Sequence, residues 1–212
     1  MYKKRIKSIL DFFIGLCGFP FFLVALIIFG PIIYFTDRGP IFYNANRIGK
    51  NGKLFKMYKF RSMYVNAPDI RLEDGSTYNG EDDPRVTKIG KFMRDMSIDE
   101  IPQILNLLNG TMSLIGPRPD PPDWLDKYPK DVKIFLTVKP GITGYSQAYF
   151  RNSADGFEKM KNDAYYAKNC NFIMDIRVFF KTIAVVLGRD NTYKDTSMEE
   201  NAKKQVEELR KK

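Results

Sequence analysis

The pattern of apolar and polar residues is most distinctive near the N-terminus. From Phe12 to Phe35 the chain runs through 24 consecutive residues without a charge, which is long enough to cross the ~30 Å hydrocarbon layer of a bilayer. The run is too long for the apolar region of a cleaved signal peptide, and no small-x-small cleavage site follows it. We therefore expect residues 1–36 to form a retained membrane anchor.

Basic residues flank this run on both sides. Four precede it and six follow it: Lys3, Lys4, Arg5 and Lys7, then Arg38, Arg47, Lys50, Lys53, Lys56 and Lys59. Positively charged flanks stay in the cytoplasm, so a helix that enters the bilayer and returns satisfies both flanks. Pro20, or Pro31 with Gly30, can break the helix. The pattern favours a re-entrant helical hairpin, with a kinked single-pass anchor as the alternative.

Beyond the apolar run, residues 41 to 63 alternate between apolar and polar positions around Asn51-Gly52. This dipeptide readily adopts the positive φ angles of a type I′ turn. We predict a β-hairpin whose second strand carries Lys59 on one face and Phe60 on the other. Strand lysines usually form a solvated basic face, and that is the structural alternative to a functional role.

The remaining pattern predicts short helices in an α/β fold. A polar segment, residues 66 to 84, separates the hairpin from two short amphipathic stretches, and two longer ones follow. These stretches contain Ile89, Phe92, Met93 and Met96; Ile104, Leu105, Leu107 and Leu108, closed by Gly110; Phe157 to Lys168; and Phe172 to Leu187. Aromatic residues in the last two could rest in the lipid headgroup layer: Tyr165, Tyr166, Phe172, Phe179 and Phe180. We expect a compact cytosolic catalytic domain over residues 37–190 and a charged tail or helix over residues 191–212.

The amino-acid composition limits the kinds of catalytic and metal site that the chain can form. The 212 residues include 34 Lys and Arg against 25 Asp and Glu, a net charge of +9, and no histidine. Ser-His-Asp triads, imidazole bases and His-containing zinc sites are therefore excluded. Cys17 and Cys170 are far apart, with no CxxC spacing, which is typical of a reduced cytoplasmic compartment. A mean hydropathy of −0.33 excludes a polytopic membrane protein.

Two adjacent carboxylates, Asp99 and Glu100, follow Ser97. Ser-x-x-Glu is a capping box, so a helix cap is a strong structural interpretation. Because Pro102 lacks the N–H that such a register requires, Asp99 fits equally well as the N-cap. Either register places Asp99 among free N–H groups, where the carboxylate would stay ionised and a phosphate could bind beside it.

Arg118 stands between Pro117 and Pro119, so its guanidinium is presented on a stiff backbone that suits recognition of a phosphate. An ordinary proline-rich turn is an equal alternative. Together with Lys59 and Arg94, the arginine and the acid pair suggest a phosphorylated substrate handled at a membrane surface. The chain contains no Walker A or GxGxxG motif.

Five sequence blocks in this order resemble the small monotopic phosphoglycosyl transferases, which are bacterial sugar transferases. The blocks are Lys59-Phe60-Arg61-Ser62-Met63, Asp82-Asp83-Pro84-Arg85-Val86-Thr87, Ser97-Ile98-Asp99-Glu100-Ile101-Pro102-Gln103, Met112-Ser113-Leu114-Ile115-Gly116-Pro117-Arg118-Pro119 and Lys139-Pro140-Gly141-Ile142-Thr143-Gly144. The resemblance extends from the apolar run to Leu187. One departure is Phe19-Pro20, where the family usually breaks its re-entrant helix at Ser-Pro.

The resemblance implies transfer of a phospho-sugar from a UDP-sugar to polyprenol (undecaprenyl) phosphate, with release of UMP. The reaction would take place at the cytoplasmic face of the bacterial inner membrane, early in a glycoconjugate pathway. It implies that Asp99 is the nucleophile of a covalent intermediate and a contact of Mg²⁺, and that Glu100 completes a catalytic dyad. Arg118, Lys59 and Arg94 would bind substrate phosphate, and no nucleic-acid partner is expected.

Two alternatives remain at this point. One is a direct membrane-anchored glycosyl transferase that uses a carboxylate base and forms no covalent intermediate. The other is a non-catalytic anchored module that uses the net charge of +9 to bind polyanions or acidic lipids. A binder of this kind has no need for Asp99, so Asp99→Asn would leave its affinity intact.

Overall fold

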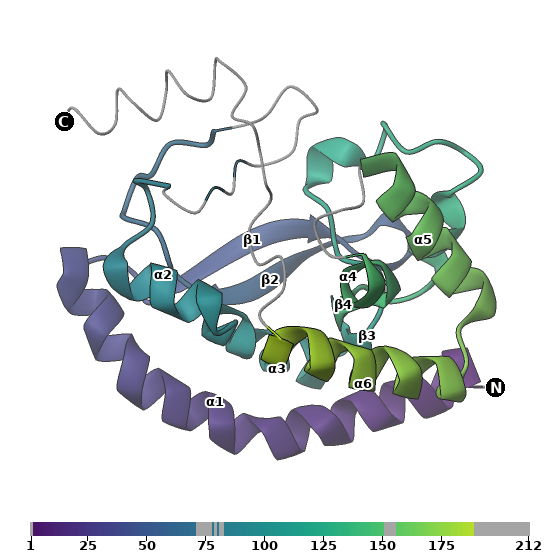
Figure 1. Ribbon diagram of the computed structural model, residues 1–212, viewed down its shortest axis with the longest axis horizontal. Helices are drawn as coiled ribbons and strands as arrows, with labels where there is room; N and C mark the ends of the chain where they lie inside the picture. Colours follow the sequence, from purple (N-terminus) through teal and green to yellow (C-terminus); the bar gives the residue numbers. More distant parts are fainter. Residues whose placement is uncertain (1, 71–77, 79, 81–82, 151–155, 189–212) are drawn as a thin grey trace.

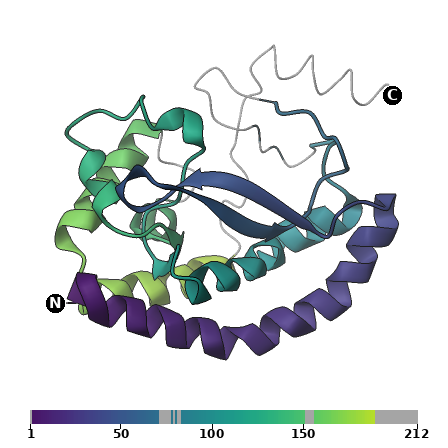
Figure 2. The ribbon, with the colours of Figure 1, turned by 180° about the vertical axis from the view of Figure 1, so that it is seen from behind.

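The computed structural model describes residues 2–70, 78, 80, 83–150 and 156–188. The expected tail over residues 191–212 lies outside this range, as do Asp82 and much of the polar segment before it. Figures 1 and 2 show one long helix, α1 (Lys7–Asp37), along one side of a mixed helix and sheet domain. A π-helical turn, Tyr2–Ile6, leads into α1. The predicted mixture of helix and sheet is therefore confirmed.

The expected re-entrant helical hairpin is not confirmed: α1 is one continuous helix through both Pro20 and Pro31. The helix instead curves as a whole, and its two ends rise toward the domain (Figures 1 and 2). Each proline removes one backbone hydrogen bond and crowds the preceding turn, which bends a helix without necessarily ending it. Helix α1 is long and apolar enough to cross a membrane.

Most of the apolar surface of α1 is exposed. Phe21 and Phe35, for example, are 73% and 76% exposed. Its inner side packs closely on the domain: a Cβ atom on Gly15 would lie 3.1 Å from Leu107, and one on Gly18 would lie 3.0 Å from Ile104. An exposed apolar surface of this extent is costly in water, so the structure supports association of this helix with a membrane.

Ionic contacts fasten both ends of α1. Near its start, Lys7 Nζ lies 2.5 Å from Asp175 Oδ2, and the backbone N–H of Leu114 donates to Asp11 Oδ1 at 2.9 Å. At its end, Arg61 forms a two-pronged ion pair with Asp37, with N···O distances of 2.7 and 2.6 Å. The curved helix α1 is therefore bound to the domain near both of its ends.

The predicted β-hairpin is confirmed. Strands β1 (Phe42–Ile48) and β2 (Leu54–Phe60) pair antiparallel. Asn51 and Gly52 have φ angles of 58° and 75°, and the Lys53 N–H donates to the Lys50 carbonyl, as a type I′ turn requires. The turn also forms a short 3₁₀ segment, Lys50–Gly52.

Each predicted helical stretch is helical in the structure. Those elements are α2 (Lys88–Asp95), α3 (Ile104–Leu108), α5 (Gly156–Asn169) and α6 (Phe172–Gly188). The elements between them are the 3₁₀ helices η3 (Ile98–Gln103), η4 (Pro122–Trp124) and η5 (Lys133–Thr137), and the short helix α4 (Tyr145–Tyr149). A parallel pair, β3 (Ser113–Ile115) with β4 (Gly141–Thr143), was not expected. Three residues are too few to show strand periodicity.

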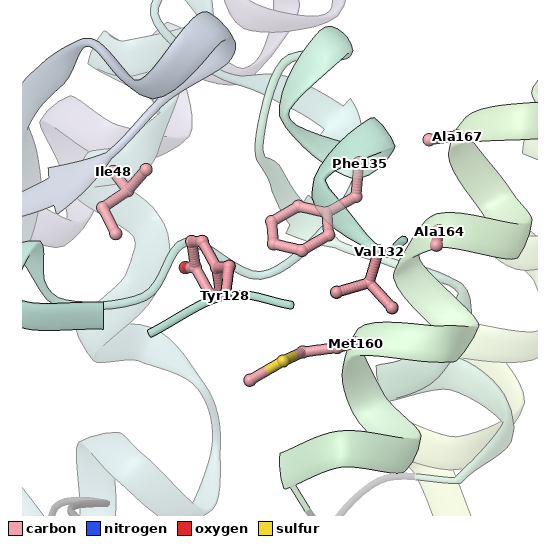
Figure 3. Close-up of a cluster of buried hydrophobic side chains, with 7 residues drawn as sticks. All are labelled: Ile48, Tyr128, Val132, Phe135, Met160, Ala164 and Ala167. Atoms are coloured by element: carbon pink, nitrogen blue, oxygen red, sulfur yellow. The ribbon is translucent and has the colours of Figure 1, made fainter. Parts of the chain in front are cut away.

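Two apolar clusters place these elements. One joins η5 to α5, and Figure 3 shows the rings of Tyr128 and Phe135 meeting edge to face within it, with centroids 4.9 Å apart. The other joins α1 to β2 and α2 through Phe22, Phe60 and Met93.

The aromatic residues expected near a headgroup layer divide into two groups. Tyr165, Phe172, Phe179 and Phe180 are exposed, whereas Tyr166 is fully buried. The hydroxyl of Tyr166 donates to Asp175 Oδ1 at 2.6 Å. Tyr166 therefore belongs to the core, because a buried hydroxyl needs a partner that lipid cannot supply.

Candidate active site

The acid pair lies on η3, a 3₁₀ helix that begins directly after Ser97. Pro102 cannot donate to the carbonyl four residues before it, which explains why this segment does not continue as an α-helix. Ser97 has a φ of 55°, a left-handed conformation that is uncommon for a residue with a side chain. This turn directs the chain from α2 into η3.

Neither capping interpretation of the acid pair holds within the described residues. The Ser97 side chain makes no capping hydrogen bond there, and Asp99 lies inside η3 instead of at its N-cap. The Glu100 backbone N–H donates to the Ser97 carbonyl at 3.3 Å, so the reciprocal side-chain bonds of a capping box are replaced by a backbone turn. The two carboxylates are thus available for another role.

Glu100 is the centre of an ionic cluster that joins three separate segments. Lys59 Nζ, from β2, lies 2.6 Å from Glu100 Oε1 and 3.8 Å from Asp99 Oδ2. Arg118 Nη2, from the loop after β3, lies 3.3 Å from the same Glu100 oxygen. The structure therefore brings together Lys59, both acids and Arg118, which are up to 59 positions apart in the sequence.

The two acids differ in their surroundings. Burial opposes ionisation of Glu100, but Lys59 and Arg118 outweigh it and lower the pKa of Glu100 to about 2. Burial raises the pKa of Asp99, while Lys59 opposes that rise and Glu100 adds to it. Asp99 is 7% exposed and accepts no hydrogen bond from the described residues. Among the described residues no N–H group binds Asp99, contrary to the expectation; nearby cations lower its pKa, but burial outweighs them.

Arg94 approaches the cluster from α2 (Lys88–Asp95). Its Nε donates to the Ser62 hydroxyl at 2.9 Å, and its charge lowers the pKa of Asp99. Ser62 belongs to the same sequence block as Lys59, but its link to Arg94 could not be foreseen because the two residues are 32 positions apart.

The position of Arg118 depends on two glycine-containing blocks that pack backbone against backbone. The Gly116 N–H donates to the Thr143 carbonyl at 2.8 Å, and the Gly141 N–H donates to the Pro117 carbonyl at 2.9 Å. A Cβ atom on Gly144 would lie 2.1 Å from the Gly116 carbonyl oxygen, so this approach requires glycine. The segment 140–144 therefore supports the loop after β3 that carries Arg118.

Lys159, which the sequence did not single out, supports the same loop. Its Nζ lies 2.8 Å from Asp120 Oδ2 and donates to the Arg118 carbonyl at 3.3 Å. Tyr128, from the core cluster of Figure 3, donates its hydroxyl to Asp120 at 2.9 Å. The Arg118 side chain itself is 46% exposed, so a ligand can reach it.

The acid pair, Asp99 and Glu100, is also the candidate binding site for a metal ion. The described residues contain no group of three or more acidic, cysteine or histidine side chains that could hold an ion. Mg²⁺, however, commonly binds to one or two carboxylates and completes its shell with water and substrate phosphate. Asp99 and Glu100 are two adjacent carboxylates, enough for that mode in number but too few for an all-protein cage.

The sequence was compared with known proteins. The family model described as bacterial sugar transferase matches residues 2–189. The chain belongs to this family. Within the family, it is 40% identical over 188 residues to the undecaprenyl-phosphate galactose phosphotransferase of Salmonella typhimurium, covering 81% of this chain and 40% of that protein.

Two further relatives differ in length. The UDP-N-acetylgalactosamine-undecaprenyl-phosphate N-acetylgalactosaminephosphotransferase of Aeromonas hydrophila is 35% identical, covering 86% of this chain and 44% of that protein. The exopolysaccharide production protein ExoY of Sinorhizobium fredii is 38% identical, covering 80% of this chain and 79% of that protein. The chain therefore spans less than half the length of the first two relatives and most of the length of ExoY.

Proposed function

We propose that this chain is a phosphoglycosyl transferase that moves a phospho-sugar from a UDP-sugar to polyprenol phosphate. The observation that carries the proposal is Asp99, a buried carboxylate that accepts no hydrogen bond from the described residues and lies 3.8 Å from a lysine ammonium. Such a carboxylate is a strong nucleophile because solvent does not shield it. The names of the two undecaprenyl-phosphate phosphotransferases, one of which includes a UDP-sugar, agree with both substrates.

In the first half of the reaction, an oxygen of Asp99 attacks the phosphorus that carries the sugar. A new bond joins that oxygen to phosphorus, the bridging P–O bond breaks, and UMP leaves with the electron pair. Lys59 and Arg118 offset the charge that develops on the phosphoryl oxygens. Glu100 holds these two cations beside the nucleophile, because it contacts both.

In the second half, a phosphate oxygen of the polyprenol phosphate attacks the same phosphorus. The bond to Asp99 breaks, the carboxylate is regenerated, and the product is a polyprenyl diphosphate that carries the sugar. Splitting the transfer into two displacements allows a water-soluble donor and a lipid acceptor to use one site in turn. Mg²⁺, bound by Asp99 and Glu100, would supply further charge neutralisation on the diphosphate.

Helix α1 contacts the segments that carry the site, because Asp37 pairs with Arg61 and Asp11 accepts the Leu114 N–H, and this proximity suits an acceptor embedded in lipid. We propose that α1 enters the cytoplasmic leaflet of the bacterial inner membrane and returns, so that the domain stays in the cytoplasm. Its two upturned ends, each fastened by an ion pair, support this topology, as do the basic residues on both flanks.

The test uses the purified chain in detergent with a panel of UDP-sugars, with and without polyprenol phosphate. We expect UMP release and a mass increase of one phospho-sugar on the peptide that contains Asp99. Asp99→Asn should abolish both while donor binding persists. The matched control is Asp123→Asn, since Asp123 is an exposed acid on η4. Release of UDP would instead establish a direct glycosyl transferase, and full activity of Asp99→Asn would exclude the nucleophile.

A further inference from the structure

A second basic site lies near the start of α1, away from the acid pair. It is a cavity of about 250 Å³ that includes Lys3, Lys7, Lys50, Lys139 and Asp11 in its wall. This volume is far above the roughly 10–15 Å³ that one water needs. The residues of the Asp99 cluster do not line the cavity, so the site is separate from the proposed reaction.

Two of the charged groups in this wall lack a partner among the described residues. Lys139 Nζ and Lys50 Nζ form no ion pair or hydrogen bond there. By contrast, Lys7 is paired with Asp175, and Lys3 donates to the Ala167 and Lys168 carbonyls at 2.8 Å. The cavity therefore presents two unpaired ammonium groups.

The same wall contains an unpaired acceptor. Asp11 is 2% exposed, and its Oδ1 accepts the Leu114 N–H, but its buried Oδ2 has no hydrogen-bond partner. An unsatisfied buried carboxylate oxygen is costly, and it favours a ligand that carries a donor group. Asp11 and Lys50 also both act on the pKa of Lys139, which burial lowers, so these charges lie close together.

The cavity lies at the edge of the exposed apolar surface. Asp11 is followed directly by Phe12 and Phe13, which are 46% and 56% exposed. Cys170, in the cavity wall, precedes the exposed Phe172 at the start of α6, and Figures 1 and 2 show this end of α6 beside the start of α1. With α1 seated in a bilayer, charged groups beside its exposed apolar surface would lie near the phospholipid headgroups.

We propose that this cavity binds the headgroup of a membrane phospholipid. The phosphodiester pairs with Lys139 and Lys50, and a hydroxyl or ammonium group of the headgroup donates to Asp11 Oδ2. Four lysines against Asp11 and the Asp175 partner leave a net charge of +2, which favours an anionic headgroup. The proposal rests on the membrane association of α1 that the proposed function also uses.

The test measures binding of dihexanoyl phosphatidylglycerol, below its micelle concentration, to the full chain in detergent by calorimetry. We expect Lys139→Met and Lys50→Met each to weaken binding at least about tenfold, as the loss of a charge-assisted contact predicts. The matched control is Lys53→Met, because Lys53 is an exposed lysine next to the same hairpin turn but not in the cavity wall. Its affinity should equal that of the parent protein.

Two other probes decide the class of ligand. Dihexanoyl phosphatidylcholine, whose headgroup has no donor, should bind at least about tenfold more weakly, and Asp11→Asn should reduce this preference. Inorganic phosphate should compete poorly. Equal binding of phosphatidylcholine, equal binding of inorganic phosphate, or unchanged affinity in both lysine variants would each overturn the proposal. UMP release, measured on the parent protein and on the Lys139 and Lys50 variants, reports the proposed function separately, since neither lysine belongs to the Asp99 cluster.

Discussion

Lys59 lowers the pKa of the proposed nucleophile, Asp99, so Lys59→Met should shift the pH dependence of the enzyme. Only ionised Asp99 can attack, so kcat/KM falls as the pH falls through the pKa of Asp99. Burial has already raised that pKa, and Lys59 opposes the rise. Without the ammonium group, the pKa of Asp99 rises further and the acid limb of the profile moves to higher pH.

The size of the effect follows from the 3.8 Å between Lys59 Nζ and Asp99 Oδ2. Coulomb's law gives about 4 kcal/mol at an effective dielectric constant of about 20, and about 1 kcal/mol at the value for water. Since about 1.4 kcal/mol corresponds to a factor of ten, the ionised fraction on the acid limb should fall by at least about fivefold. The assay is UMP release across a pH series, analysed as kcat/KM.

Glu100→Gln provides the opposite perturbation at the same site. Glu100 raises the pKa of Asp99 through its own negative charge, so its neutralisation should move the acid limb to lower pH. Both variants will also lower the maximal kcat/KM of the pH profile, because each disturbs the cluster that holds Lys59 and Arg118. The direction of the shift isolates the electrostatic effect from that loss. If both variants moved the limb in the same direction, or moved neither, the assignment of the limb to Asp99 would be refuted.

Three further predictions concern the loop that carries Arg118, the end of α1 at Asp37, and Pro20 within α1. Arg118→Lys should lower kcat/KM by at least about tenfold, because a point charge cannot reproduce a two-pronged contact to phosphate; kinetics equal to the parent would assign Arg118 to a surface turn. Arg61→Met should destabilise the chain by about 1.5–3 kcal/mol, since it removes the charge-assisted hydrogen bonds to the partly exposed Asp37, and the unfolding midpoint in detergent measures this; loss of the exposed Lys127 to Asp123 pair should cost under about 1 kcal/mol. Pro20→Ala should straighten α1 and allow some N-termini to cross the membrane, which labelling of a single cysteine near residue 3 by an impermeant reagent detects, while such labelling in the parent protein would refute the re-entrant topology.

The sequence predicted the elements whose conformation depends on residues close together in the chain. Asn51-Gly52 selects a type I′ turn by its backbone preferences alone, and the apolar spacing in α2 and α6 identifies the buried face of a helix. The same local logic failed at Ser97. A capping box was reasonable from four residues, but Pro102 enforces a 3₁₀ helix and Ser97 adopts a left-handed conformation.

The sequence could not predict the side-chain contacts between residues that are far apart in the chain. The link from Ser62 to Arg94, the support of Arg118 by Lys159, and the role of Asp11 at β3 all join residues at least 32 positions apart. A strand lysine such as Lys59 has the same sequence pattern whether it is solvated or paired with Glu100. The curvature of α1 is a further case, because the position of a proline does not specify whether a helix bends or breaks.

The contacts that fasten α1 and those that form the acid cluster come from the same short segments. Arg61, which binds Asp37, is two residues from Lys59, and Leu114, which binds Asp11, is four residues from Arg118. Residues 59–61 and residues 114–118 therefore each include one contact to α1 and one contact to Glu100. A displacement of either end of α1 would act on a segment that carries Lys59 or Arg118, because only two to four residues separate each α1 contact from the cation. We therefore expect turnover to respond to a perturbation that alters the bend of this helix.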